Sequence, residues 1–247
     1  MPISKNQIKW ITSLQQKKHR VKEGFFVAEG IKVVNEFLDS KCELHCLYLT
    51  DDIRVDYEQY SHQILSHKEL SRISSLKTPN KILGLFKIPN QYPLEDKGLT
   101  VVLDQINDPG NLGTIIRLCD WFGVKELICS KDTVECYNAK VVQSSMGSLT
   151  RVEVKYVDLL TYLTQNDRPV YLADMEGENV YHETLPENGV VIMGNEANGV
   201  SSDIKEMVKK KLTIPRFGEF QCTESLNVAT ATAILLHEFR RSIGKSN

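Results

Sequence analysis

Short apolar runs alternate with helix-like segments throughout the C-terminal part of the chain, and this alternation limits the possible folds most strongly. Several runs are continuous in apolar residues, as expected for strands that are covered on both faces. Strands that alternate with helices form mainly parallel sheets. The sequence therefore predicts an α/β domain with a mainly parallel sheet. Its predicted strands are residues 100–105, 126–130, 151–157, 169–174, 189–194 and 211–215.

The N-terminal part predicts a second, smaller α/β domain. Ile8, Ile11 and Leu14 are spaced as on one face of a helix, and a helical face is also predicted within residues 25–40. Strands are expected at residues 44–50 and 81–88, which are rich in apolar and aromatic residues. Two prolines and mixed charge then indicate a linker. The predicted organisation is a small domain over 1–90, a linker over 91–98 and a larger domain over 99–247.

The composition is that of an ordinary globular protein. The 247 residues are 41% hydrophobic and 25% charged, which is enough to fill a core. A formal charge of −2 argues against a uniformly basic nucleic-acid binder, but it leaves room for a local basic surface. Such a surface is predicted near the N-terminus, although an ordinary solvated helix face explains the same pattern equally well. Its residues are Lys5, Lys9, Lys17, Lys18, Arg20 and Lys22.

The cysteines and histidines predict no metal site. None of the six cysteines forms a C-x-x-C pair, and no histidine cluster has zinc-ligand spacing. Cys119 and Cys129 lie in apolar runs, so they are predicted core residues. We expect a reduced, cytoplasmic setting, with no signal peptide and no apolar run near the ~18–20 residues of a membrane span.

The segment NDPGNLGTIIR, residues 107–117, follows a predicted strand, and ligands collect at the carboxyl ends of parallel strands. Gly110 and Gly113 would let the backbone approach a ligand, while Asn111 offers a donor and an acceptor. Arg117 is expected to reach back from the following helix, for which Gly123 is the expected stop. Taken alone, this segment is better interpreted as a turn followed by a helix N-terminus, with Arg117 in solvent. It lacks the glycine pattern of a dinucleotide-binding fold.

Two further polar segments follow predicted strands. In MGNEANGVSSDI, residues 193–204, Glu196 is flanked by asparagines and glycines, although an exposed polar turn would look the same. The third segment, IPRFGEFQCTESLNVATATAILL, leads into the last and longest helix. This helix is expected to start at Ser225, which would cap it, with Asn227 in the first turn.

Together, DPGNLGTIIR, MGNEANG and IPRFG…ESLNVATATAILLHEFRR resemble the three signature motifs of the SpoU (TrmH-like) branch of the SPOUT RNA methyltransferases, in the same order. The segment KWITSLQQKKHRVKEGFFVAEG resembles the small RNA-binding substrate domain fused ahead of the catalytic domain. The resemblance implies transfer of a methyl group from S-adenosylmethionine to a ribose 2′-hydroxyl in tRNA or rRNA. It also implies a C-terminal trefoil knot around the cofactor and a homodimer.

The resemblance assigns roles to individual residues. It implies catalytic roles for Asn111, Arg117, Glu196, Ser225 and Asn227. It implies cofactor contacts, largely through backbone atoms, around Gly194, Ile214 and Leu226.

The chemistry limits what these side chains can do. Methyl transfer requires an aligned oxygen, a proton acceptor and a group that holds the adjacent phosphate. A guanidinium suits the phosphate, and the family mechanism also proposes this arginine as the base. Because arginine has a pKa above about 12, a neutral form is scarce, and both roles stay open for Arg117. Glu196 could orient Arg117 or loop amides, while Ser225 and Asn227 could position the ribose or its phosphate.

The chain departs from the family pattern in one loop. Here EFQCTE separates Gly218 from Ser225, a longer connection than family members commonly have, with the extra residues around 220–222. A deformed cofactor loop would bind S-adenosylmethionine more weakly, or only with RNA or a partner. The alternative function is therefore a non-catalytic RNA-binding or ribosome-assembly protein with the same fold.

Overall fold

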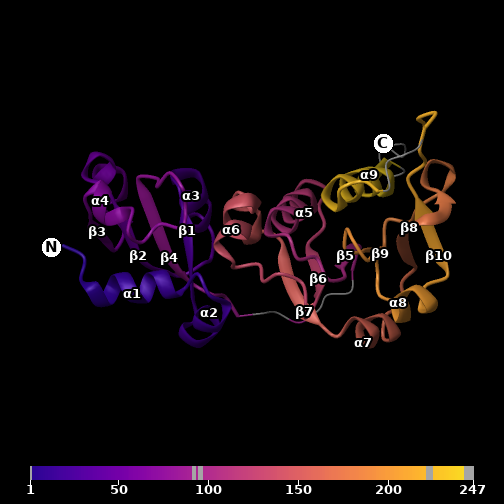
Figure 1. Ribbon diagram of the computed structural model, residues 1–247, viewed down its shortest axis with the longest axis horizontal. Helices are drawn as coiled ribbons and strands as arrows, with labels where there is room; N and C mark the ends of the chain where they lie inside the picture. Colours follow the sequence, from indigo (N-terminus) through magenta and orange to yellow (C-terminus); the bar gives the residue numbers. More distant parts are fainter. Residues whose placement is uncertain (1, 91–92, 94–96, 221–224, 242–247) are drawn as a thin grey trace. The chain divides into compact units, whose positions relative to one another are not determined.

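The computed structural model describes residues 2–90, 93, 97–220 and 225–241, which form two compact units (Figure 1). The first unit contains Met1–Asn90 and Glu135–Thr150, and the second contains Gln91–Val134 and Arg151–Asn247. Most of the predicted linker, residues 91–98, lies outside the described residues.

The first unit is built on a four-stranded mixed sheet. The strand order is β1-β4-β2-β3, in which β4 runs antiparallel to β1 and β2 while β3 is parallel to β2. Its elements are α1 (Lys5–Ser13), α2 (Lys17–Glu23), β1 (Phe25–Glu29), α3 (Ile31–Leu38), β2 (Leu44–Leu49), β3 (His62–Ile64), α4 (His67–Leu70), β4 (Ile82–Lys87) and α6 (Ala139–Ser145). The strands predicted over 44–50 and 81–88 are confirmed as β2 and β4. Strand β1 was not predicted, because its apolar residues lead directly into those of the helix that follows Gly30.

Residues 135–150 complete the core of the first unit. Val142 of α6 is buried in the same apolar cluster as Phe26 and Phe37. The ring of Tyr137 lies 4.7 Å from that of Phe26, between centroids. This segment follows β6 in the chain, yet it packs in the core formed by the N-terminal residues.

Arg20 does not belong to the predicted basic surface. Its side chain is 2% exposed, and its Nη1 donates to the carbonyl oxygens of Leu14 and Gln15 at 2.8 and 2.9 Å. Its Nε donates to a carboxylate oxygen of Glu135 at 2.8 Å. Arg20 therefore joins the corner between α1 and α2 to residues 135–150. The other five basic residues of that segment, all lysines, are exposed.

The second unit is built on a six-stranded sheet in which each pair of neighbouring strands is parallel. Its order is β10-β8-β9-β5-β6-β7. The strands are β5 (Leu99–Leu103), β6 (Glu126–Ser130), β7 (Glu153–Val157), β8 (Val170–Asn179), β9 (Gly189–Met193) and β10 (Lys210–Thr213). All six predicted strands are present, and the predicted α/β class is confirmed. The predicted trefoil knot stays a prediction.

Helices cover both faces of this sheet. Helices α5 (Pro109–Trp121) and α9 (Val228–Arg241) pack together on one face, while α7 (Leu159–Thr164) and α8 (Ser202–Met207) cover the other (Figure 1). Helix α5 ends just before Gly123, whose φ of 67° makes it the predicted stop. Cys119 and Cys129 are fully buried as predicted, and burial raises the pKa of the Cys119 thiol.

Two helix-start expectations were wrong. Residues 109–113 are not a loop, because α5 begins at Pro109 after the capping residue Asp108. Helix α9 begins at Val228, not at Ser225. Asn227 is its capping residue, with its Oδ1 accepting hydrogen bonds from the backbone N–H groups of Ala229 and Thr230 at 3.0 and 3.3 Å.

No helix among the described residues is long and apolar enough to cross a membrane. The expected cytoplasmic location stays a prediction.

Candidate active site

A cavity of about 470 Å³ lies in the second unit, bounded by β8, the end of β9, the loops after β9 and β10, and the start of α9. Strand β5 pairs with β9 on one side and β6 on the other, so the direction of winding reverses at β5. Ligands bind beside such a switch point, at the carboxyl ends of the strands. The cavity wall combines apolar side chains with the charged residues Asp174, Glu196, Lys205 and Arg216.

All three residues assigned to the cofactor line this cavity: Gly194, Ile214 and Leu226. At Gly194 the backbone passes very close to the next part of the loop. A Cβ atom there would lie 2.4 Å from the carbonyl carbon of Gly199 and 2.5 Å from the backbone nitrogen of Val200. Only glycine fits this crossing without moving the backbone.

Three of the residues assigned to catalysis are joined by hydrogen bonds beside the cavity. Asn227 donates its Nδ2 to Oδ1 of Asn111 at 3.0 Å. Asn111 in turn donates its Nδ2 to Oε1 of Glu196. The three residues come from three segments far apart in the chain, which are the start of α9, the first turn of α5 and the loop after β9.

The start of α9 sets the direction of this chain of hydrogen bonds. The Oδ1 of Asn227 accepts from the first turn of α9, so its amide nitrogen faces Asn111. Asn111 then accepts through Oδ1 and has its own NH₂ left to donate to the Glu196 carboxylate. The backbone N–H of Asn111 is bonded to the capping Asp108 at 2.8 Å, which fixes the residue further.

A strained residue at the end of β5 supports the same region. Gln105 has a φ of 57°, which is unusual for a residue with a side chain. Its N–H donates to Oγ of Ser130 at 2.9 Å, and its carbonyl accepts from Nδ2 of Asn195 at 2.8 Å. A strained backbone conformation persists where surrounding contacts hold it in place, and these two hydrogen bonds hold Gln105.

Asp104 and Asn195 are supporting residues that the sequence did not identify as part of the site. Asp104 is buried, and its carboxylate accepts from the N–H of Ser201 at 2.8 Å. Asn195 closes its own loop by accepting from the N–H of Ala197 at 2.9 Å. The available signal for Asp104 was a carboxylate at the end of an otherwise apolar strand, where a buried charge needs a partner.

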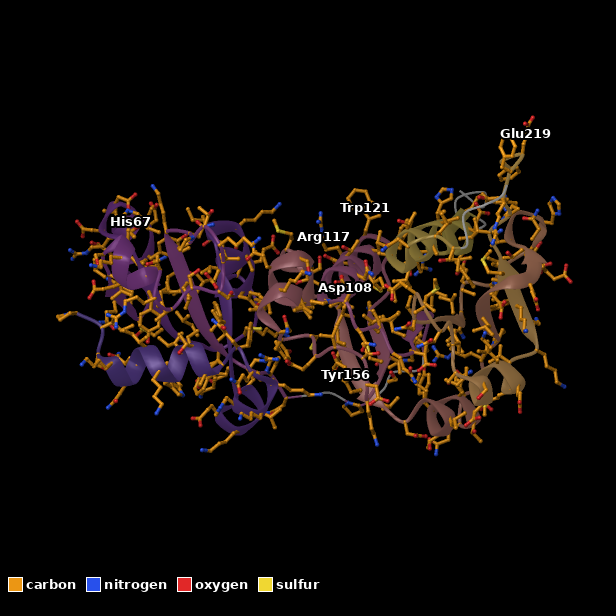
Figure 2. The ribbon with its side chains drawn as sticks, in the orientation of Figure 1. His67, Asp108, Arg117, Trp121, Tyr156 and Glu219 are labelled. Carbon is orange, nitrogen blue, oxygen red and sulfur yellow. The ribbon has the colours of Figure 1, made fainter. Side chains whose placement is uncertain are left out.

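Arg117 lies apart from these residues. Six positions along a helix correspond to about 9 Å of rise and about 240° of rotation, so Arg117 and Asn111 occupy different faces of α5. Figure 2 shows Arg117 and Trp121 projecting from α5 on the side away from the sheet. Arg117 is exposed, and it makes no hydrogen bond or ion pair with the described residues. The expectation that it reaches back to residues 107–113 is not met.

Ser225 and Glu196 complete the assigned set. Both side chains are exposed, and both residues line the cavity. The site therefore has a cavity with apolar and charged side chains in its wall, a polar edge formed by the hydrogen-bonded chain, and an exposed arginine on another face of α5.

Family models match both parts of the chain. Residues 98–237 match the SpoU rRNA Methylase family, and residues 5–84 match the MRM3-like substrate binding domain. The 23S rRNA (guanosine(2553)-2′-O)-methyltransferase of Bacillus subtilis is 30% identical over 246 residues, covering 96% of this chain and 97% of that protein.

Solved structures agree with this assignment over nearly the whole chain. A TrmH-family protein from Porphyromonas gingivalis superimposes with a TM-score of 0.86 and 35% identity, covering 97% of this chain and 99% of that one. An rRNA methyltransferase from Sinorhizobium meliloti with bound AdoMet has a TM-score of 0.85 and 27% identity, covering 98% of both chains. The chain therefore belongs to the SpoU rRNA methylase family.

Proposed function

We propose that this protein methylates a ribose 2′-hydroxyl of 23S rRNA. The chain is an S-adenosylmethionine-dependent RNA ribose methyltransferase, in agreement with its family and its AdoMet-bound relative. The choice of 23S rRNA follows the name of the Bacillus subtilis relative. The observation that carries the proposal is the hydrogen-bonded chain of Asn227, Asn111 and Glu196 at the edge of the cavity.

The cavity suits S-adenosylmethionine in size and lining. Its volume of about 470 Å³ lies within the range of roughly 300–1,000 Å³ for small-molecule sites. The close crossing at Gly194 removes any side chain from one wall, so a planar group can approach the backbone there. We assign adenine-edge contacts to the backbone around Gly194, Ile214 and Leu226. Bound in this cavity, S-adenosylmethionine supplies a sulfonium methyl group that is already activated for displacement.

The side chains at the cavity edge are proposed to orient the RNA. Ser225 and Asn227 lie where they can position the ribose, while Glu196 holds the Asn111 amide in one orientation. Arg117 is proposed to bind the phosphate next to the target ribose. An exposed guanidinium offers five N–H donors and no acceptor, which suits a phosphate better than the role of a base.

Cofactor binding is tested by thermal unfolding. At a concentration 100 times its Kd, a ligand that binds the native state adds about 2.7 kcal/mol of stability. For a protein of this size, that corresponds to a rise in Tm of about 5–10 °C. We expect this rise with S-adenosylmethionine and with S-adenosylhomocysteine. Adenosine at the same concentration is the control.

Methyl transfer is tested on RNA. The purified protein is expected to transfer labelled methyl groups from S-adenosylmethionine to 23S rRNA transcribed in vitro. Nucleoside mapping of RNA from a deletion strain should then lack one 2′-O-methyl group. Binding of the RNA with neither transfer nor a cofactor-dependent rise in Tm would favour the non-catalytic alternative. Transfer to tRNA alone would refute 23S rRNA as the substrate.

We also propose that the protein is a homodimer, as the family resemblance implies. Trp121 at the end of α5 is 85% exposed, and an exposed tryptophan is typical of an interface. We expect sedimentation at the mass of two chains, and a shift toward one chain in Trp121→Glu. Val55→Glu changes a similarly exposed apolar residue of the first unit and serves as the control. A single-chain mass for the unchanged protein would refute the dimer.

A further inference from the structure

The loop after β10 exposes two phenylalanine rings. Phe217 is 83% exposed and Phe220 is 86% exposed. Two such rings within four residues are unusual on a globular surface, where large apolar side chains are mostly covered. Figure 2 shows the loop, marked by Glu219, projecting from the body of the second unit.

Phe217 is supported on one side. Its ring stacks against that of Tyr181, with centroids 6.3 Å apart and an angle of 29° between the planes. Tyr181 belongs to the short helical turn Val180–His182 directly after β8. The ring is therefore partly held in place while most of its surface stays open to solvent.

The same loop begins at the cavity wall. Ile214, Pro215 and Arg216 line the cavity, and Phe217 is the next residue. Beyond the loop, Ser225 and Leu226 line the cavity again. The described residues on either side of the two phenylalanines therefore belong to the wall of the cavity proposed to hold the reacting groups.

We propose that Phe217 and Phe220 bind an unstacked base of the substrate RNA beside the methylated nucleotide. This inference rests on the proposed function. Proteins that read RNA stack splayed bases on aromatic side chains, and every base offers a π-face for this contact. The cationic Arg216 precedes Phe217 in the chain and lines the cavity, which suits a nucleotide because it carries a phosphate as well as a base.

The residues around the rings favour RNA over another protein. The two phenylalanines lie in a segment that also contains the charged residues Arg216 and Glu219. Protein interfaces bury contiguous apolar surface at their centre. Exposed aromatic faces beside charged residues match the recognition of a nucleotide, which has a base and a phosphate.

The test uses the full-length protein and 23S rRNA transcribed in vitro. We expect Phe217→Ala and Phe220→Ala to raise the KM for this RNA about 5- to 150-fold, the range for the loss of one base–aromatic stack. The Kd for S-adenosylmethionine should be unchanged. Phe→Tyr at either position should keep the KM, because the aromatic face is retained, whereas Phe→Leu should raise it. Val55→Ala, at an exposed residue of the first unit, is the matched control.

Three results would overturn the inference. An unchanged KM in the alanine variants would show that no base is bound. Equal KM values for the tyrosine and leucine variants would show that stacking is not the contact. A changed sedimentation mass would assign the rings to an interface between two copies. Loss of the proposed function looks different, since the unaltered protein would then transfer no methyl group to this RNA.

Discussion

Replacing Arg117 by alanine is expected to lower the rate of methyl transfer by about 10²–10³-fold, the effect of removing one group that stabilises charge in the transition state. The Kd for S-adenosylmethionine should not change, because Arg117 does not line the cavity. Folding should not change either, since the side chain is exposed and has no partner among the described residues. Single-turnover transfer to 23S rRNA with saturating cofactor measures the effect.

Arg117→Lys separates charge from geometry. Lysine keeps the positive charge but not the planar fork that binds two phosphate oxygens, so partial activity is expected. Arg54→Ala is the control, because Arg54 lies exposed on the first unit and forms only a 3.7 Å surface pair with Glu58. Full activity in Arg117→Ala would exclude any essential role for this side chain.

Gly194→Ala is expected to abolish the rise in Tm caused by S-adenosylmethionine. The new methyl group would overlap backbone atoms of Gly199 and Val200, which cannot move away as a flexible side chain can. The loop after β9 must therefore shift into the cavity or strain the fold, at a cost of roughly 1–3 kcal/mol for such overpacking. Thermal unfolding with and without the cofactor measures both effects.

Gly218→Ala is a closely matched control. Gly218 lies in the loop that leaves the same cavity, but a Cβ atom there would meet nothing within 4 Å. The Tm and its cofactor-dependent rise should both stay as in the unaltered protein. A normal cofactor response in Gly194→Ala would mean that the close crossing is not needed for the cavity.

The strands of the second unit could be predicted because each leaves a direct mark on the sequence. Every residue of Leu99–Leu103 and of Gly189–Met193 is buried, and Thr100 is the one polar side chain in these two segments, so both appear in the sequence as nearly continuous apolar runs. Strand β1 of the first unit carries no such mark. Its apolar residues continue into α3 across Gly30, whose φ is 90°.

Which side chains meet at the site depends on the order of the strands in the sheet, and local sequence does not encode that order. Asn111 and Glu196 meet because β5 pairs with β9, although 85 residues separate the two side chains in the chain. The sequence also could not show that Asn227 caps the last helix instead of Ser225, since serine and asparagine are both good caps. Helix α5 already begins at Pro109, so Asn111 and Arg117 lie on the same helix and point to different sides of it. The sequence did not indicate this early start, because Gly110 and Gly113 are typical of a loop.

The placement of residues 135–150 in the first unit affects how the protein can be made and divided. A fragment ending at Asn90 would lack Val142 from its apolar core and would leave the buried guanidinium of Arg20 without the Glu135 carboxylate. An unpaired buried charge of this kind is strongly destabilising. During synthesis the N-terminal unit cannot complete its core until residues 135–150 have left the ribosome, and β5, α5 and β6 leave it before them. The N-terminal unit therefore completes its core only after the first strands of the second unit have been made, and cutting the gene at the apparent linker would not yield an independent module.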